Sequence, residues 1–215
     1  MGEYSVPAGV AQAEIRVSNS RFIAHLAPAA DIEAARAFIE RIRTEYADAT
    51  HNVPAYVIGH GASVTAHSND DGEPSGTAGR PVLAVLQGSG LGDVVVVVTR
   101  YFGGTKLGTG GLVRAYTEAA QAVLAVVHTA RRAPVHHVRF VMPYPIYEQA
   151  RNLITHLGGE LVEEDFAVEV TVEVRLLSSQ LDALHEGLTE LSRGQVEIEI
   201  LGVDENAIWP EEGAA

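Results

Sequence analysis

Cysteine is absent from this 215-residue sequence. Its absence excludes disulfide bridges, thiol nucleophiles and cysteine-ligated metal sites, and it is compatible with a reducing cytosol. Long hydrophobic runs are lacking too: the valine run from Val94 to Val98 is far shorter than the roughly 20 residues of a membrane-spanning helix. The N-terminus has no basic segment followed by an apolar one, as a signal peptide requires. We therefore expect a soluble, cytoplasmic protein, and no motif indicates a cofactor.

Basic residues are scarce, with 15 Lys and Arg against 28 Asp and Glu, a formal net charge of −13. The deficit is uneven. Residues 1–130 contain nine basic and twelve acidic residues, whereas residues 131–215 contain six and sixteen. The C-terminal part should therefore repel a phosphate backbone, and any anion site is expected in the N-terminal part.

Two domains are expected. The segment from Arg131 to His137, RRAPVHH, interrupts a helical apolar pattern with a proline at the place where the charge balance changes. We place one domain at residues 1–132, a second at 133–205, and a frayed tail at 206–215.

The first domain combines strands and helices. Glu14–Val17 and Arg21–Leu26 predict a hairpin, and Asp31 is suited to cap a following amphipathic helix. The β-branched run beginning at Asp93 predicts a central strand, buried on both faces. Further strands are expected in VPAYVIG and SVTAHS, and further helices near Pro81 and from about Gly111 onward.

The second domain reads as βαββαβ, the order of a ferredoxin-like α+β domain with two helices on one face of a four-stranded sheet. Strict alternation in AVEVTVEVRL fixes the faces, because a one-residue slip would bury the charged set. We expect one set of side chains to face the helices: Val168, Val170, Val172 and Val174. The opposite set should face away: Glu169, Thr171, Glu173 and Arg175.

The stretch TRYFGGTKLGTGGLVRAY, residues 99–116, contains five glycines, three cations and no acid. It matches neither a P-loop nor a dinucleotide-binding fingerprint. Free N–H groups at the start of the following helix, together with nearby cations, would bind an anion. Alternatively, the glycines only permit a tight turn and close backbone packing. The predicted anion cleft consists of Arg100, Lys106, Gly108, Gly110, Gly111 and Arg114.

The loop SNDDGEPSGTAGRP is expected beside this cleft. Its carboxylates, with His67, have the chemistry to ligate a hard cation, but the calcium-loop pattern is absent, and no metal site is predicted. Its hydroxyls suit phosphate contact or turn capping, and capping is favoured. The residues expected to support the cleft are His51, Asp70, Asp71, Glu73, Ser75 and Thr77.

Four motifs in this order closely resemble the YigZ/IMPACT family: SRFIAHLAPA, DATHNVPAYVIG, SNDDGEPSGTAGRPVLAVL and VVVTRYFGGTKLGTGGLVRAY. The resemblance covers roughly residues 15–127, and residues 135–201 resemble the C-terminal domain of the bacterial two-domain type. The matching motif positions are His51, Asp70, Asp71, Gly72, Glu73, Pro74, Gly76, Thr77, Gly79, Arg100, Tyr101, Gly103, Gly104, Leu107, Gly108, Gly110, Gly111, Arg114 and Tyr116. Many relatives carry cysteine where this chain has Val53, so a function that needs this thiol does not transfer.

The resemblance implies that the first domain has the α/β fold of the second domain of a small-subunit ribosomal protein. That fold followed by a ferredoxin-like domain is similar to domains IV and V of elongation factor G. The eukaryotic relatives regulate translation under amino-acid stress through a partner that does not transfer to the bacterial type. The family supplies no agreed catalytic residue.

Three functions remain open. The first is a translation-associated regulatory protein that contacts RNA, the ribosome or a translation factor through the basic cleft, without DNA specificity. The second is an enzyme acting on a phosphorylated small molecule or nucleotide. The third is an adaptor whose acidic sheet face meets a basic partner. Binding is favoured over catalysis.

Overall fold

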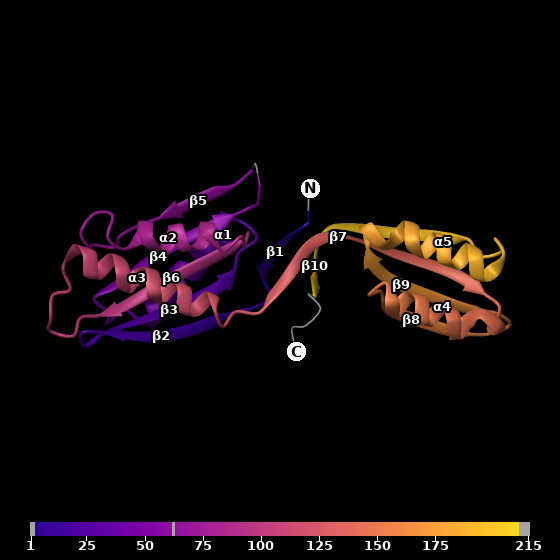
Figure 1. Ribbon diagram of the computed structural model, residues 1–215, viewed down its shortest axis with the longest axis horizontal. Coiled ribbons are helices and arrows are strands. Elements are labelled where there is room, and N and C mark those ends of the chain that lie inside the picture. Colours follow the sequence, from indigo (N-terminus) through magenta and orange to yellow (C-terminus); the bar gives the residue numbers. More distant parts are fainter. Residues whose placement is uncertain (1–2, 62, 211–215) are drawn as a thin grey trace. The chain divides into compact units, whose positions relative to one another are not determined.

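The computed structural model describes residues 3–61 and 63–210. The fold is mixed α/β and divides into two compact units, formed mainly by residues 4–131 and 132–209. They are called here the N-terminal and the C-terminal domain (Figure 1). In the described ranges no helix has the length and apolar character needed to cross a membrane.

The N-terminal domain is built on an antiparallel sheet with strand order β2-β3-β6-β4-β5. The strands are β2 (Ala11–Val17), β3 (Ser20–Pro28), β4 (His51–Ile58), β5 (Thr65–Ser68) and β6 (Val94–Tyr101). The predicted hairpin is confirmed as β2 and β3, and the valine run is confirmed as the central strand β6. Apolar side chains on both faces of β6 let helices cover both sides of the sheet.

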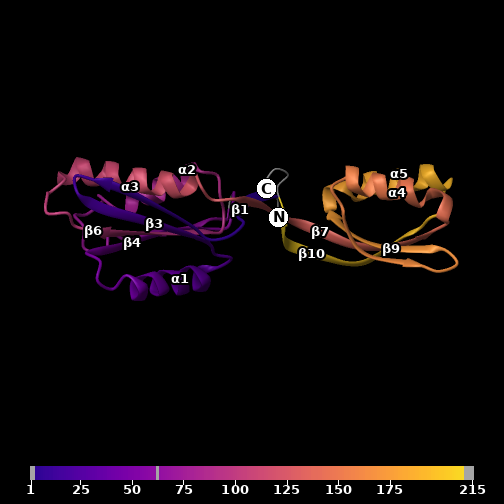
Figure 2. The ribbon, with the colours of Figure 1, turned by 90° about the horizontal axis from the view of Figure 1, so that it is seen from below.

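Helices lie on both faces of this sheet (Figure 2). On one face, α1 (Ile32–Glu45) packs against Val95 and Val97 of β6. On the other, α2 (Gly79–Gly88) and α3 (Gly108–Leu124) pack against the alternate valines. Asp31 caps α1 as predicted, because its carboxylate accepts the N–H of Ala34 at 2.7 Å.

The C-terminal domain shows the predicted βαββαβ order. Its elements are β7 (Thr129–Met142), α4 (Tyr144–His156), β8 (Glu160–Phe166), β9 (Val170–Leu177), α5 (Leu181–Ser192) and β10 (Ile198–Pro210), with a 3-10 turn at Ser178–Gln180. β9 lies between β7 and β8, and β10 pairs with β7. Both helices cover the same face of the sheet (Figure 2).

Alternation along β9 sets the faces as predicted, with one exception. Val170, Val172 and Val174 are buried under the helices, whereas the charged set is at least partly exposed. The expectation for Val168 is wrong, because its side chain is 94% exposed. It lies in the turn that precedes β9, where the strand periodicity does not yet apply.

The expected tail is also partly wrong. Residues 206–210 belong to β10, where Ala207 and Trp209 are buried against Val135. An apolar pair two residues apart is the signal of a half-buried strand, and its burial outweighs fraying. Residues 211–215 lie outside the described residues. A short strand, β1 (Tyr4–Pro7), was not expected, and it pairs with β7, which begins before the predicted domain boundary.

Candidate functional site

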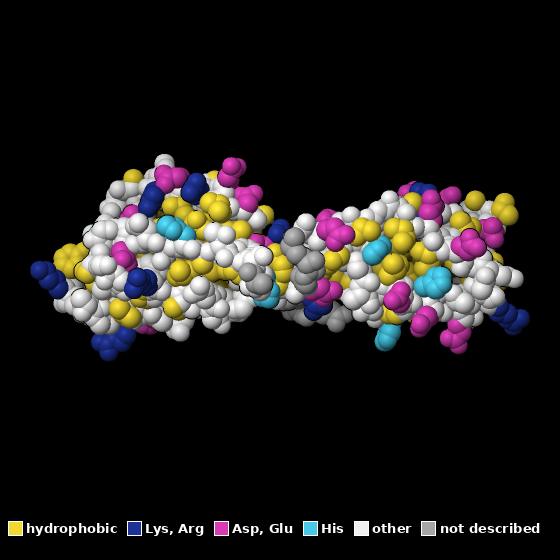
Figure 3. Space-filling model, turned by 90° about the horizontal axis from the view of Figure 1, so that it is seen from above, with side chains coloured by type: hydrophobic (Ala, Val, Ile, Leu, Met, Phe, Trp, Pro, Cys, Tyr) yellow, Lys and Arg dark blue, Asp and Glu magenta, His cyan; other side chains and the backbone are white. Residues whose placement is uncertain are grey.

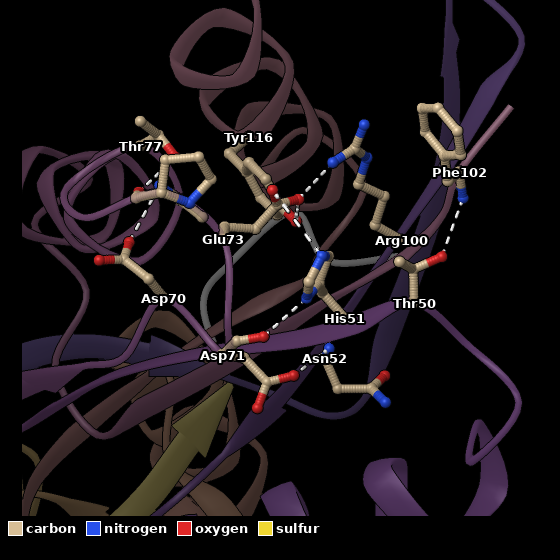
Figure 4. A network of polar contacts seen from close by, with 12 residues as sticks. Thr50, His51, Asn52, Asp70, Asp71, Glu73, Thr77, Arg100, Phe102 and Tyr116 are labelled. Carbon is tan, nitrogen blue, oxygen red and sulfur yellow. Dashed lines mark hydrogen bonds and ion pairs between the residues drawn. The ribbon is translucent and has the colours of Figure 1, made fainter. Parts of the chain in front are cut away.

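Glu73 forms the centre of a buried polar network in the N-terminal domain (Figure 4). Its carboxylate Oε1 accepts a hydrogen bond from Arg100 Nη1 at 2.5 Å and one from the Tyr116 hydroxyl at 2.8 Å. The other oxygen, Oε2, lies 3.8 Å from His51 Nε2. The Glu73 and Arg100 side chains are only 4% and 6% exposed, so this is an internal ion pair.

Sheet register brings the partners of Glu73 together. Arg100 on β6 lies opposite Phe22 on β3 and opposite His51 on β4, so the three side chains share one face of the sheet. The guanidinium carbon of Arg100 lies 5.4 Å from the Phe22 ring centroid and 5.7 Å from that of Phe102. These rings shield the cation from water and strengthen its attraction to Glu73.

Tyr116 reaches the network from α3. Its ring is fully buried and meets Phe22 edge-on, with 5.2 Å between centroids. Burial, followed by the nearby Glu73 carboxylate, raises the pKa of Tyr116 far above its usual value. The hydroxyl therefore stays protonated and remains a hydrogen-bond donor to Glu73.

His51 is held in one orientation by the acidic loop. Its Nδ1 lies 2.7 Å from the backbone oxygen of Asp71. A carbonyl oxygen only accepts, so Nδ1 must donate, which leaves Nε2 facing Glu73. His51 is therefore a well-oriented imidazole, but its side chain is only 19% exposed, which leaves little of it accessible to a ligand.

Asp70 serves the architecture of the loop. Its carboxylate accepts the backbone N–H groups of Gly76, Ala78 and Gly79 at 2.8, 3.1 and 2.8 Å, which covers the start of α2. Partial burial acts to raise the pKa of Asp70, but these backbone donors outweigh it and bring the pKa below the usual range. Because its carboxylate oxygens already accept these backbone hydrogen bonds, Asp70 stabilises the loop.

Asp71 ties the loop to the sheet and to α1. Its Oδ2 accepts the N–H of Asn52 at 2.7 Å, and its Oδ1 lies 3.2 Å from Arg43 Nη2. Neither Asn52 nor Arg43 was expected in the site, and their spacing along the sequence gives no signal. Among the described residues, no group of three or more His, Asp or Glu side chains is arranged to hold a metal ion.

The two hydroxyls of the loop differ. Thr77 is buried, and its Oγ1 donates to the carbonyl of Pro74 at 2.6 Å, which is the capping role favoured from the sequence. Ser75 is exposed.

The predicted anion cleft is corrected in one respect: Arg100 is buried and neutralised by Glu73, whereas Lys106 and Arg114 are exposed. Arg114 and Tyr116 lie two residues apart on α3 and so point to opposite sides of the helix. The inward position belongs to Tyr116, which leaves Arg114 outside. Two positions close together in the glycine-rich stretch therefore lie in different environments, with Arg114 exposed and Tyr116 buried.

The helix after the turn begins at Gly108, three residues before the expected start. Gly108 and Gly110 are exposed and Gly111 is half-buried. The first turn of α3 has no acidic residue and no side-chain cap, so its N–H groups are open to an anion. Glycine is required at position 103 for packing instead, because a Cβ there would lie 2.1 Å from the backbone carbon of Asn19.

Comparisons with known proteins agree with the two-domain division. Residues 18–124 match the Impact N-terminal domain, and residues 140–195 match a domain of unknown function, DUF1949. The chain is 35% identical over 206 residues to the IMPACT family member YigZ of Escherichia coli, covering 95% of this chain and 100% of that protein. It is 38% identical over 185 residues to YvyE of Bacillus subtilis, covering 86% and 85%.

One solved structure, described as a hypothetical protein, superimposes with a TM-score of 0.62 at 35% identity. The match covers 94% of this chain and 98% of that one.

Proposed function

The chain belongs to the IMPACT family, and we propose that it is a translation-associated regulatory protein whose N-terminal domain binds RNA, the ribosome or a translation factor. The contact is the segment from Phe102 to Arg114, called here the basic turn. The translational role rests on the family resemblance drawn from the sequence. The proposed contact rests on one observation, the unneutralised charge of this turn.

Most cations near the site are already paired. Arg100 is neutralised by Glu73, Arg43 by Glu40 and Asp71, and Arg21 by Glu14. In contrast, Lys106 and Arg114 are exposed and have no ion pair within the described part of the chain. The open N–H groups of α3 add partial positive charge at the same turn.

An exposed aromatic ring accompanies these cations. Phe102 is 47% exposed, immediately after β6 and beside the β2–β3 hairpin turn. Figure 3 shows Lys or Arg side chains next to exposed hydrophobic surface at the left end of the N-terminal domain. Cations that track phosphates, together with a ring on which a base stacks, are the elements of single-stranded RNA binding.

Binding is favoured over catalysis because the acids of the site are engaged. Asp70 accepts three backbone donors, and Glu73 accepts from Arg100 and Tyr116. An acid–base catalyst needs a group that reaches the substrate, and both carboxylates are turned toward the protein. An enzyme acting on a phosphorylated small molecule is the less favoured alternative.

We also infer the fold of each domain. The βαββαβ order, with β10 and β9 on either side of β7, supports a ferredoxin-like C-terminal domain. The N-terminal sheet with helices on both faces supports the ribosomal-protein-like fold that the resemblance implies. We also propose that the two domains fold independently and are joined near Arg132.

The test is RNA binding by the full chain, measured as fluorescence anisotropy of a labelled single-stranded RNA, with ribosome co-sedimentation at low and high salt. The double variant Lys106→Gln/Arg114→Gln should weaken binding roughly tenfold and flatten its salt dependence, since about 0.7 counterion is released per phosphate contact. The matched control, Arg151→Gln/Arg193→Gln, removes two exposed cations of the C-terminal domain and should bind as the wild type does. Equal binding by both double variants contradicts the proposal.

A further inference from the structure

A pocket of the N-terminal domain lies on the α1 side of the sheet, away from α2 and α3. It is open to solvent and has a volume of about 400 Å³ between α1 and the strands β4 and β5. Pockets for small ligands span roughly 300–1,000 Å³, so this one suits a compact molecule. Its charged and polar lining comprises Arg36, Glu40, Arg43, Tyr56, His67 and Asn69.

Helical spacing brings the charges to the pocket. Arg36, Glu40 and Arg43 lie four and three residues apart on α1 and therefore share one side of the helix. Glu40 pairs with Arg43 at 2.9 Å, and Arg43 also contacts Asp71. Because Glu40 is engaged by Arg43, Arg36 has no ion pair among the described residues. The pocket thus offers one free guanidinium.

Two aromatic side chains form the opposite wall. Tyr56 on β4 lies directly across from His67 on β5, and their ring centroids are 5.4 Å apart. Neither the Tyr56 hydroxyl nor the His67 ring has a hydrogen-bond partner in the described ranges. Ile39 and Pro54 add apolar surface. Figure 3 shows Lys or Arg and His side chains around hydrophobic surface on this upper side of the domain.

We infer that this pocket binds one nucleotide unit, with its base against Tyr56 and His67 and its phosphate on Arg36. A base needs a ring to pack on and a few hydrogen-bonding groups at its edge. The exposed His67 ring, backed by buried Tyr56 at an interplanar angle of 34°, supplies the surface, and the Tyr56 hydroxyl and the His67 ring nitrogens supply the hydrogen-bonding groups. A phosphate needs a cation that is not already neutralised, and Arg36 supplies it. The unit comes either from a free mononucleotide or from single-stranded RNA.

The pocket is independent of the basic turn. It uses residues of α1, β4 and β5, whereas the proposed RNA contact uses the start of α3. It is joined to the candidate site through Asp71, which contacts Arg43 on one side and Asn52 on the other. The pocket residue Arg43 is therefore in direct contact with the loop that contains Glu73.

The experiment is isothermal titration of the full chain with AMP, adenosine and inorganic phosphate. AMP should bind more tightly than either part alone. Arg36→Gln should weaken AMP binding about tenfold or more, the loss of one charge-assisted hydrogen bond, and leave adenosine binding unchanged. His67→Ala should weaken both. The matched control is Arg41→Gln, an exposed arginine of α1 that lines a different pocket, and it should bind AMP as the wild type does.

A hexameric adenosine RNA distinguishes the two sources of the nucleotide. If this RNA competes with AMP for the wild type, and Arg36→Gln abolishes that competition, the bound unit comes from RNA. If AMP binds and the RNA does not compete with it, the bound unit is a free nucleotide. Retained AMP binding in Lys106→Gln/Arg114→Gln separates this inference from the proposed function. The inference is overturned if AMP does not bind, or if Arg36→Gln binds AMP and RNA as tightly as Arg41→Gln does.

Discussion

Glu73 and Arg100 form a buried ion pair that joins the loop before α2 to the central strand β6. The pair explains why an acidic loop and a basic, glycine-rich turn stand next to each other in one domain. Its charges neutralise each other inside the protein, while Lys106 and Arg114 of the basic turn are exposed.

The effects of substituting Glu73 and Arg100 should be coupled. Arg100→Met leaves the Glu73 carboxylate buried without its cation and should lower the free energy of unfolding by about 3–5 kcal/mol. Glu73→Gln leaves Arg100 unpaired and should cost a comparable amount. The double variant should be destabilised by less than the sum of the single variants, with a coupling of about 1–3 kcal/mol. Urea unfolding followed by circular dichroism measures all three, and strict additivity would show that the pair is not coupled.

His25 should make stability depend on pH. The ring is buried next to Tyr46, and burial lowers the pKa of His25 to about 4, with Glu45 opposing and Arg41 reinforcing this shift. In the unfolded chain the pKa is near 6.5, so between about pH 6.5 and 4 only the unfolded state binds the proton. The stabilisation is complete above pH 6.5 and is lost as the pH falls, by about 2 kcal/mol at pH 5.

The check on His25 compares unfolding free energies at pH 7.5 and pH 5 in the wild type and in His25→Leu. The drop in unfolding free energy from pH 7.5 to pH 5 should be smaller in the variant by about the His25 contribution, whatever the variant's own stability at pH 7.5. An identical difference between the two pH values in both proteins would assign the effect to other groups. His67→Ala is the control, since His67 is exposed.

Two glycines of the basic turn should respond in opposite ways to alanine. A Cβ at Gly103 meets the backbone of Asn19 at 2.1 Å, so Gly103→Ala must displace main chain and should destabilise by more than about 2 kcal/mol. A Cβ at Gly110 has open space within α3, so Gly110→Ala should stabilise by up to about 1 kcal/mol. Thermal unfolding distinguishes the two variants, and equal effects would contradict the assignment of Gly103 to backbone packing and of Gly110 to an unobstructed position in α3.

Trp209 should prove structural although it lies near the end of the sequence. The ring is 7% exposed in the cluster with Val135 and Ala207, and the Arg175 guanidinium carbon lies 5.6 Å from its centroid. Trp209→Ala should therefore lower the free energy of unfolding by about 3–5 kcal/mol. Ile208→Ala is the neighbouring control, since Ile208 is 49% exposed and should cost well under 1 kcal/mol. Equal losses would place Trp209 outside the core.

The sequence alone determined what depends on local periodicity and composition. The alternation along β9, the valine run of β6 and the Asp31 cap each act over a few residues, and each is found as expected. The resemblance likewise located the loop and the basic turn, because the family motifs are contiguous.

Only the tertiary structure decided which cations are free. Arg100 and Arg114 look alike in the sequence, but register places Arg100 opposite His51 and under Glu73, and helical phase turns Arg114 outward. Arg36 and His67 are distant in the sequence and line one pocket only because α1 packs against β4, the neighbour of β5. A charge is available to a ligand only if no neighbour neutralises it, and neighbours distant in the sequence are set by packing.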